Sequence, residues 1–162
     1  MPDYVITPDK CNHETTPMSI YLKKIEKHIL SLNNQFHNST VQWNDEAKSN
    51  FIITVLNGYL FPSIIVVQAM NNHEYVIDGT QRLSVCLDFK NNKFKIGHNI
   101  KRPIIKYQVT DKIIEFDLRD KFYKDLPDEL QDDFNNYNIH IDCYSNCSNE
   151  DIIFHMQRYN IV

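Results

Sequence analysis

The sequence lacks long apolar runs, an excess of basic residues, and linkers rich in Gly or Ser. Apolar stretches such as residues 64–67 are far shorter than the roughly 20 residues of a membrane-spanning helix, so we expect no membrane association. The 17 basic residues are outnumbered by 21 acidic ones, and the net charge of −4 disfavours a protein that clamps the nucleic-acid backbone. A chain of 162 residues without a linker, an internal repeat or a low-complexity segment predicts one domain.

The spacing of the cysteines and the N-terminal sequence bear on metal binding and location. Cys143 and Cys147 lie four residues apart with His140 and His155 nearby, but no second cysteine pair completes a set of four zinc ligands. We therefore expect no zinc and reduced thiols, as in cytosolic proteins. The N-terminal segment has no apolar core of signal-peptide length, which also indicates a cytoplasmic location.

The first part of the chain predicts two helices. Residues 1–16 are expected to form an irregular arm, and residues 17–162 to form the domain. Apolar residues between positions 19–32 recur with the spacing of one helical face. A second helix is expected to begin with an Asn or Asp cap after Trp43 and to end near Gly58. The indole of Trp43 is expected to line the core or a groove.

The middle of the chain predicts two strands and a helix. Residues 63–68 are apolar on both faces and rich in β-branched side chains, which predicts a buried strand. Residues 74–77 are expected to form its hairpin partner after a turn at residues 70–73. The apolar spacing of residues 80–90 predicts a helix directly after this second strand.

The second half of the chain has more strand patterns than helix patterns. Alternating apolar and polar residues predict short strands at residues 94–96, 104–109, 112–116 and 139–143. Pro127 fits the first turn of a short helix, and Ser148 with Asp151 resembles a capping box that opens a last helix. This irregular alternation predicts an α+β fold with a small mixed β-sheet flanked by helices.

The segment Asp78-Gly79-Thr80-Gln81-Arg82 carries the clearest chemical signal. It joins an expected strand to an expected helix, so its turn presents helix N–H groups and the positive end of the helix dipole to a ligand. Gly79 has no side chain where a phosphate would approach, and Arg82 offers a guanidinium to that phosphate. Asp78 is suited to hold Mg²⁺ or to orient a water, and Gln81 to hydrogen-bond a phosphate or a base.

A plainer interpretation explains the same residues. Asp78 would cap the helix, Gly79 would serve the turn, and Arg82 would pair with an exposed carboxylate. Taken alone, the segment favours this interpretation, because strand–turn–helix units with an acidic cap are common.

A resemblance to a known family shifts the balance towards a phosphate site. Residues 76–83, VIDGTQRL, resemble the Asp-Gly-x-Gln-Arg signature of the N-terminal domain of GmrS-type (GmrSD), modification-dependent restriction proteins, a family of the ParB/sulfiredoxin-like superfamily. Other segments similar to this family occur in the same order along the chain, at residues 43–67, 88–96, 122–127 and 158–160.

The resemblance implies a single ParB/sulfiredoxin-like domain with a phosphate pocket around the signature. In that family the domain binds or hydrolyses nucleoside triphosphates and regulates DNA cleavage. By position, the catalytic residues would be Asp78, which holds Mg²⁺ or orients a water, and Arg82, which binds phosphate. The implied nucleotide-binding residues are Gly79, Thr80, Gln81, Arg82, Arg158 and Asn160. Without the family, Arg158 would be a surface arginine and Asn160 a C-terminal cap.

The chain departs from the family pattern in two places. Residues 36–43 contain no arginine, although many members carry there a Gln-Arg pair whose arginine belongs to the pocket; the loss weakens charge stabilisation at a phosphate site. The sequence stops two residues after Asn160, where relatives continue into further helices and often into a nuclease domain. It has no His-Asn-His nuclease motif, so we do not expect it to cut DNA by itself.

Two functions stay open at this point. The intact signature favours a domain that binds a nucleoside triphosphate with Mg²⁺ in a restriction or phage-defence system, with hydrolysis undecided. The missing arginine, the acidic charge and the short C-terminus favour a catalytically inactive protein that uses the same fold to bind a partner protein or a second copy. The charge disfavours direct DNA binding. A short helix is also expected to carry an acidic face, made of Asp125, Asp128, Glu129, Asp132 and Asp133. Such a face is usually a solvated surface, but it could also mimic DNA phosphates for a partner protein.

Overall fold

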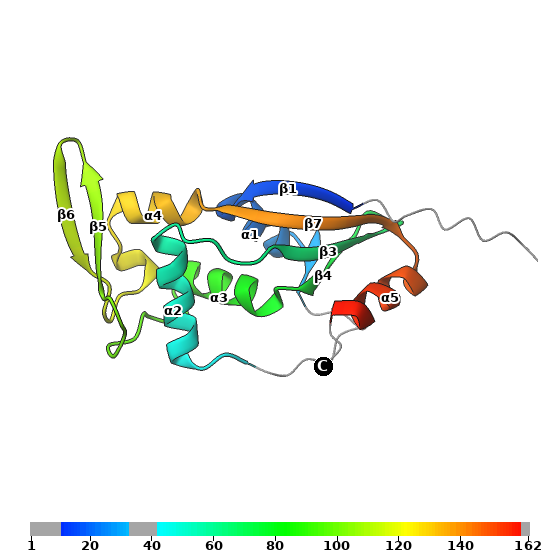
Figure 1. Cartoon of the computed structure of the whole chain (residues 1–162), viewed down its shortest axis with the longest axis horizontal. Coiled ribbons are helices and arrows are strands. Elements are labelled where there is room, and N and C mark those ends of the chain that lie inside the picture. The colour runs from blue at the N-terminus through cyan, green and yellow to red at the C-terminus, as the bar shows by residue number, and fades with distance from the viewer. Residues whose placement is uncertain (1–10, 33–41, 160–162) are drawn as a thin grey trace, which may run out of the picture.

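A mixed five-stranded sheet organises the part of the chain that the computed structural model describes, residues 11–32 and 42–159. The strand order across the sheet is β1 (Cys11–Pro17), β7 (Asn138–Cys147), β3 (Ile64–Ala69), β4 (Glu74–Asp78) and β2 (Leu30–Ser31). Strands β3 and β4 pair antiparallel, as do β1 and β7, whereas β3 pairs parallel with β7 and β2 pairs parallel with β4. This confirms the expected α+β class with a small mixed sheet (Figure 1).

The two faces of the sheet are covered by different helices. Along β3, Ile64 and Val66 belong to the main core, while Ile65 and Val67 belong to a second, smaller core. This alternation follows from the two-residue period of a strand, and it explains why the strand sequence is apolar throughout. α5 (Asn149–Tyr159) covers the second core; the main core is covered by α1 (Met18–Glu26), α2 (Asp45–Leu56), α3 (Thr80–Lys90) and α4 (Asp128–Asn135).

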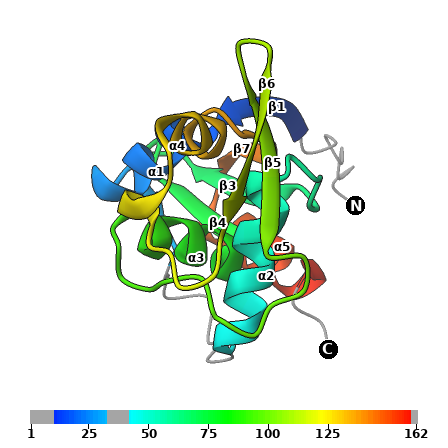
Figure 2. The same ribbon diagram turned by 90° about the vertical axis from the view of Figure 1, so that its left-hand side faces the viewer.

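A separate hairpin stands at the end of the molecule opposite α5. It consists of β5 (Ile104–Val109) and β6 (Lys112–Asp117), and a short 3₁₀ turn, η1 (Tyr123–Asp125), follows it. Figures 1 and 2 show the hairpin standing away from the main sheet. Ile105 is buried in the main core and fixes the base of the hairpin, whereas Ile113 is 73% exposed near its tip.

Several predicted elements agree with the structure. The helix expected at residues 80–90 is α3, and the strands expected at 104–109 and 112–116 are β5 and β6. The Asn44 side chain caps α2 by accepting a hydrogen bond from the Ala47 N–H at 2.8 Å. Trp43 packs edge-on against Phe51, with 5.3 Å between ring centroids, at the border of the core.

Three predictions were wrong. Residues 11–16, expected within an irregular arm, form most of β1; this edge strand is largely exposed and therefore polar, so its sequence shows no apolar alternation. The helix expected over residues 19–32 ends at Glu26, because the chain turns at His28, where φ is 58°, and continues into β2. Residues 94–96 form no strand; Ile96 is buried and makes backbone hydrogen bonds only with the loop at residues 120–121.

The cysteines are reduced thiols, and the described helices are short. Cys11, Cys86, Cys143 and Cys147 are free thiols, and three of them are buried. No helix within residues 11–32 and 42–159 has the length and apolar character needed to cross a membrane.

The capping box of α5 yields a prediction on stability. The Asp151 carboxylate accepts a hydrogen bond from the Ser148 N–H at 2.8 Å, and the Ser148 hydroxyl accepts one from the Asp151 N–H at 3.2 Å. Replacing Ser148 by Ala should lower the free energy of unfolding by about 1 kcal/mol in urea titrations. Ser145→Ala, which removes a serine hydroxyl that accepts a hydrogen bond from Asn12 and takes no part in the cap, is the control. An equal loss in both variants would contradict the role of the cap.

The same cap predicts a pH dependence. Hydrogen bonds from the Ser148 backbone and side chain lower the pKa of Asp151 below its ordinary value. Its ionised form therefore stabilises the fold above the pKa of the unfolded chain, and this contribution disappears as the pH falls through the lowered pKa. The stability difference between the wild type and Asp151→Asn should be largest near neutral pH and vanish in acid. A difference independent of pH would contradict this assignment.

Candidate functional site

The predicted phosphate turn lies where β4 ends and α3 begins. Gly79 is the N-cap residue of α3, with φ 110° and ψ 9°, a left-handed conformation. The cap makes no side-chain hydrogen bond to the helix, and the first turn contains no acidic residue. The positive end of the α3 dipole is therefore not offset by a local carboxylate from within the helix, which is the arrangement of anion sites at helix N-termini.

Both the packing and the left-handed backbone favour glycine at position 79. A Cβ on residue 79 would overlap the Cδ1 of Ile64 and lie 3.4 Å from a terminal nitrogen of Arg82. Gly79 is itself buried, so this side of the turn is filled by the protein. A ligand would therefore reach the turn along its N–H groups and not from the Cβ side.

Arg82 is the most constrained side chain of the signature. Its side chain is only 12% exposed, one terminal nitrogen donates to the Pro62 carbonyl, and the other lies 3.4 Å from an Asp78 carboxylate oxygen. The Phe61 ring lies 5.7 Å from the centre of the guanidinium. Burial lowers the pKa of Arg82, and the Asp78 carboxylate partly offsets that effect. A guanidinium has more N–H donors than these two contacts use, so it retains the capacity to bind phosphate.

Asp78 does not cap α3, because the N-cap residue is Gly79. Its carboxylate is 50% exposed and pairs with Arg82, as the plainer interpretation of the sequence partly anticipated. No group of three or more His, Cys, Asp or Glu side chains able to hold a metal occurs among residues 11–32 and 42–159. A half-exposed carboxylate beside a phosphate turn nevertheless fits Mg²⁺, which often binds through one or two carboxylates, substrate phosphates and waters.

The other signature residues lie on the first turn of α3. The Thr80 hydroxyl donates to the Leu32 carbonyl at 3.5 Å, a long hydrogen bond that ties the turn to the end of the first described segment. Gln81 is half-buried. The five signature residues, 78–82, thus lie together in one short segment, as expected for neighbours in the sequence.

Arg158 lies on the helix that covers the opposite face of the sheet. It is exposed, with its guanidinium 5.7 Å from the Phe154 ring centre and 5.5 Å from that of Tyr159. Within the described residues, no contact is found between Arg158 and residues 78–82. α5 does pack on Ile77, the residue that precedes Asp78. Asn160 and residues 36–41 lie outside the described residues.

Two residues that hold Arg82 were missed by sequence reasoning about the site. Phe61 and Pro62 precede β3 and contact Arg82 from a segment about 20 positions earlier in the chain. Phe61 also stacks on Tyr137, with 5.2 Å between ring centroids and 6° between planes. No local periodicity signals such contacts; the only signal is that residues 61 and 62 lead into a buried strand paired with β4.

The comparisons with known proteins agree with the sequence analysis. The profile of the family described as "GmrSD restriction endonuclease, N-terminal domain" matches residues 39–160, which is more than half of the chain. The chain therefore belongs to the GmrSD N-terminal domain family, and this membership associates it with restriction systems. Neither a curated protein nor a solved structure matches the chain.

The packing around Gly79 predicts a difference between two glycines. Gly79→Ala adds a methyl group against Ile64 in a left-handed backbone, whereas Gly58→Ala, at φ 71°, meets no atom within 4 Å. Both variants carry the left-handed cost of about 1–2 kcal/mol, and Gly79→Ala should lose a further ~1–3 kcal/mol in urea unfolding. Ile64→Val removes the Cδ1 in question, so it should cost less in the Gly79→Ala background than alone. Additive losses would contradict the steric explanation.

Proposed function

We propose that this chain is a nucleotide-binding domain of a restriction system, with the phosphates of a nucleoside triphosphate at the Gly79 turn. The observation that carries the proposal is the start of α3: a left-handed glycine without a side-chain cap, with the Arg82 guanidinium fixed beside it. Membership of the GmrSD N-terminal domain family supports it. We further propose that the domain works in the cytoplasm, where both the nucleotide and DNA are present.

Each residue of the signature has a distinct role in this proposal. The first-turn N–H groups of α3 bind phosphate oxygens, and Arg82 supplies a positive charge whose position is fixed by Pro62. Asp78 holds Mg²⁺ together with phosphate oxygens and waters. Thr80 and Gln81 contribute polar atoms from the same turn. The family resemblance supports a further role for Arg158 and Asn160 at the nucleotide, although no contact found for Arg158 within the described residues joins it to the signature.

Hydrolysis makes a further demand on Asp78. The carboxylate that holds Mg²⁺ would also have to position a water for attack on the terminal phosphate. Arg82 already shares its charge with Asp78 and the Pro62 carbonyl, which favours binding over strong stabilisation of a transition state. We therefore propose nucleotide binding as the primary function. An assay of phosphate release in the same samples tests for hydrolysis.

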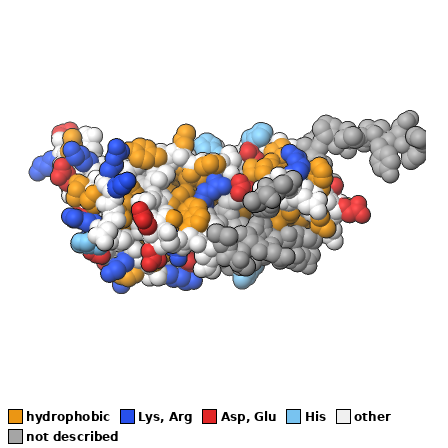
Figure 3. Space-filling view, turned by 60° about the horizontal axis from the view of Figure 1, so that its bottom comes forward, with side chains coloured by type: hydrophobic (Ala, Val, Ile, Leu, Met, Phe, Trp, Pro, Cys, Tyr) orange, Lys and Arg blue, Asp and Glu red, His pale blue; other side chains and the backbone are white. Residues whose placement is uncertain are grey.

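A second candidate is a catalytically inactive domain that binds a protein partner. Exposed apolar side chains at two places favour it: Leu60 is 79% exposed and Ile113 is 73% exposed. Direct DNA binding has less support. On the face shown in Figure 3, basic and acidic side chains are interspersed and form no continuous basic patch, in keeping with the net charge of −4.

The test of the nucleotide site is calorimetry and thermal unfolding with ATP or GTP and Mg²⁺. A ligand at a hundredfold excess over its dissociation constant should stabilise the wild type by ~2.7 kcal/mol. Arg82→Ala should lose this effect, and Asp78→Asn should lose the dependence on Mg²⁺. Arg119→Ala is the matched control, because it removes a guanidinium paired with Asp117 in the segment that follows β6.

Loss of folding is separated from loss of binding in the same experiment. Arg82→Lys keeps the charge but cannot reproduce the forked contacts, so it should fold, as judged by circular dichroism, and bind nucleotide more weakly. Unchanged nucleotide binding by a folded Arg82→Ala protein would overturn the site. Absence of binding by the wild type with either nucleotide would overturn the function and favour the second candidate.

A further inference from the structure

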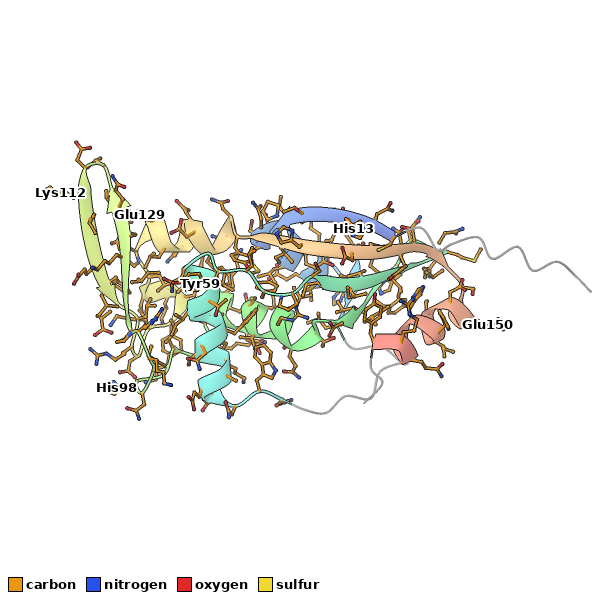
Figure 4. The ribbon with its side chains drawn as sticks, in the orientation of Figure 1. His13, Tyr59, His98, Lys112, Glu129 and Glu150 are labelled. Atoms are coloured by element: carbon orange, nitrogen blue, oxygen red, sulfur yellow. The ribbon has the colours of Figure 1, made fainter. Side chains whose placement is uncertain are left out.

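A second cavity lies away from the Gly79 turn, between the end of α2, α4 and the adjacent ends of β1 and β7. Its volume is about 690 Å³, within the range of ligand-binding pockets. Figure 4 labels Tyr59, just beyond α2, and Glu129, on α4, near this region. Its lining includes Asn57, Gly58, Leu60, Asp133, Tyr137 and Asn138.

The electrostatic character of the cavity is negative. Asp133 is its acidic residue, and no Lys or Arg lines it. Asp133 is exposed, and no ion pair of its carboxylate is found in the described part of the chain. The C-terminal end of α2 adds the negative end of a helix dipole, and its last turn contains no basic residue to offset it.

The hydrogen-bonding groups of the cavity favour a donor-rich ligand. The Asn57 amide nitrogen donates to the Ile53 carbonyl at 2.8 Å, which leaves its amide oxygen as an acceptor. The Asp133 carboxylate is also an acceptor. Acceptors on two different elements suit a guanidinium, whose N–H donors are spread around a plane, better than a compact ammonium group.

The accessible lining of the cavity is mixed, and its apolar part comes from Tyr137 and Leu60. Val55 and Leu56, from the last turn of α2, are buried beneath it, and Tyr137 is held by a 2.7 Å hydrogen bond from its hydroxyl to the Tyr59 carbonyl. Leu60 is 79% exposed and Tyr59 is 56% exposed beside the opening. An apolar wall with a carboxylate matches a side chain that has an aliphatic stem and a cationic head, and an exposed apolar rim matches a protein surface more closely than a free small molecule.

We propose that this cavity is the anchor site for an arginine side chain of a partner protein. The arginine stem lies along the Tyr137 ring, and its guanidinium pairs with Asp133. Leu60 and Tyr59 contact apolar residues that flank the arginine in the partner. The site lies apart from the proposed nucleotide site, and its occupancy does not require nucleotide.

The test uses an acetylated, amidated peptide with one arginine between two leucines, and a matched peptide with citrulline in its place. Citrulline keeps the shape of arginine but has no charge. Titrated into isotopically labelled protein, the arginine peptide should shift the amide resonances of Gly58, Leu60 and Asn138. The citrulline peptide should bind roughly two- to fivefold more weakly, because it lacks the charge that pairs with Asp133. Raising the salt concentration should weaken arginine-peptide binding.

Two variants on α4 separate the site from general electrostatics. Asp133→Asn should weaken binding of the arginine peptide roughly two- to fivefold, the size of an exposed ion pair, while Asp132→Asn, with the same change of charge one residue away, should leave it nearly unchanged. Leu60→Ser should also weaken binding, by loss of the apolar rim. All these titrations are made without nucleotide, so failure of the nucleotide site and failure of this site give different results.

The proposal is overturned by any of three outcomes. Equal binding of the citrulline and arginine peptides would show that no ion pair with Asp133 contributes to binding. Equal losses of affinity in Asp132→Asn and Asp133→Asn would show that the peptide responds to the overall negative charge of α4 and makes no specific contact with Asp133. No shift of the cavity resonances at millimolar arginine peptide would show that the cavity is not an anchor site.

Discussion

The buried guanidinium of Arg82 is the contact on which the rest of the candidate site depends. It joins the segment before β3, the end of β4 and the first turn of α3, through Pro62, Asp78 and its own helix. A charge with little access to water is costly unless it is paired and hydrogen-bonded, and here one carbonyl and one carboxylate meet that need. Gly79 makes the arrangement possible, because its missing side chain leaves room for Ile64 and Arg82.

The sheet explains why this contact lies beside a helix start. β3 is apolar on both faces, so helices cover both sides of it, and β4 leads directly from the sheet into α3. The tight turn at Gly79 keeps the N-terminus of α3 next to the edge of the main core. The candidate site and the fold thus share residues, and variants of the site need a folding control.

Local patterns predicted the local parts of this arrangement. The helix at residues 80–90 and the cap at Ser148 and Asp151 follow from apolar spacing and short-range hydrogen bonds, which a sequence displays directly. β1 was missed because an exposed edge strand is polar and owes its existence to pairing with β7, far along the chain. The contacts of Phe61 and Pro62 with Arg82 were missed for the same reason. The cavity at Asp133 also joins distant elements, so only its acidic helix was visible in the sequence.

The segment between α2 and β3 has a consequence for how the two sites communicate. Leu60 lines the cavity, while the next two residues, Phe61 and Pro62, contact Arg82. Tyr137 lines the cavity and stacks on Phe61, so it reinforces the same link. A shift of this segment on filling one site would therefore move the wall of the other. Thermodynamic reciprocity then requires that any effect of a bound partner on nucleotide affinity be matched, factor for factor, by the effect of nucleotide on the affinity for that partner.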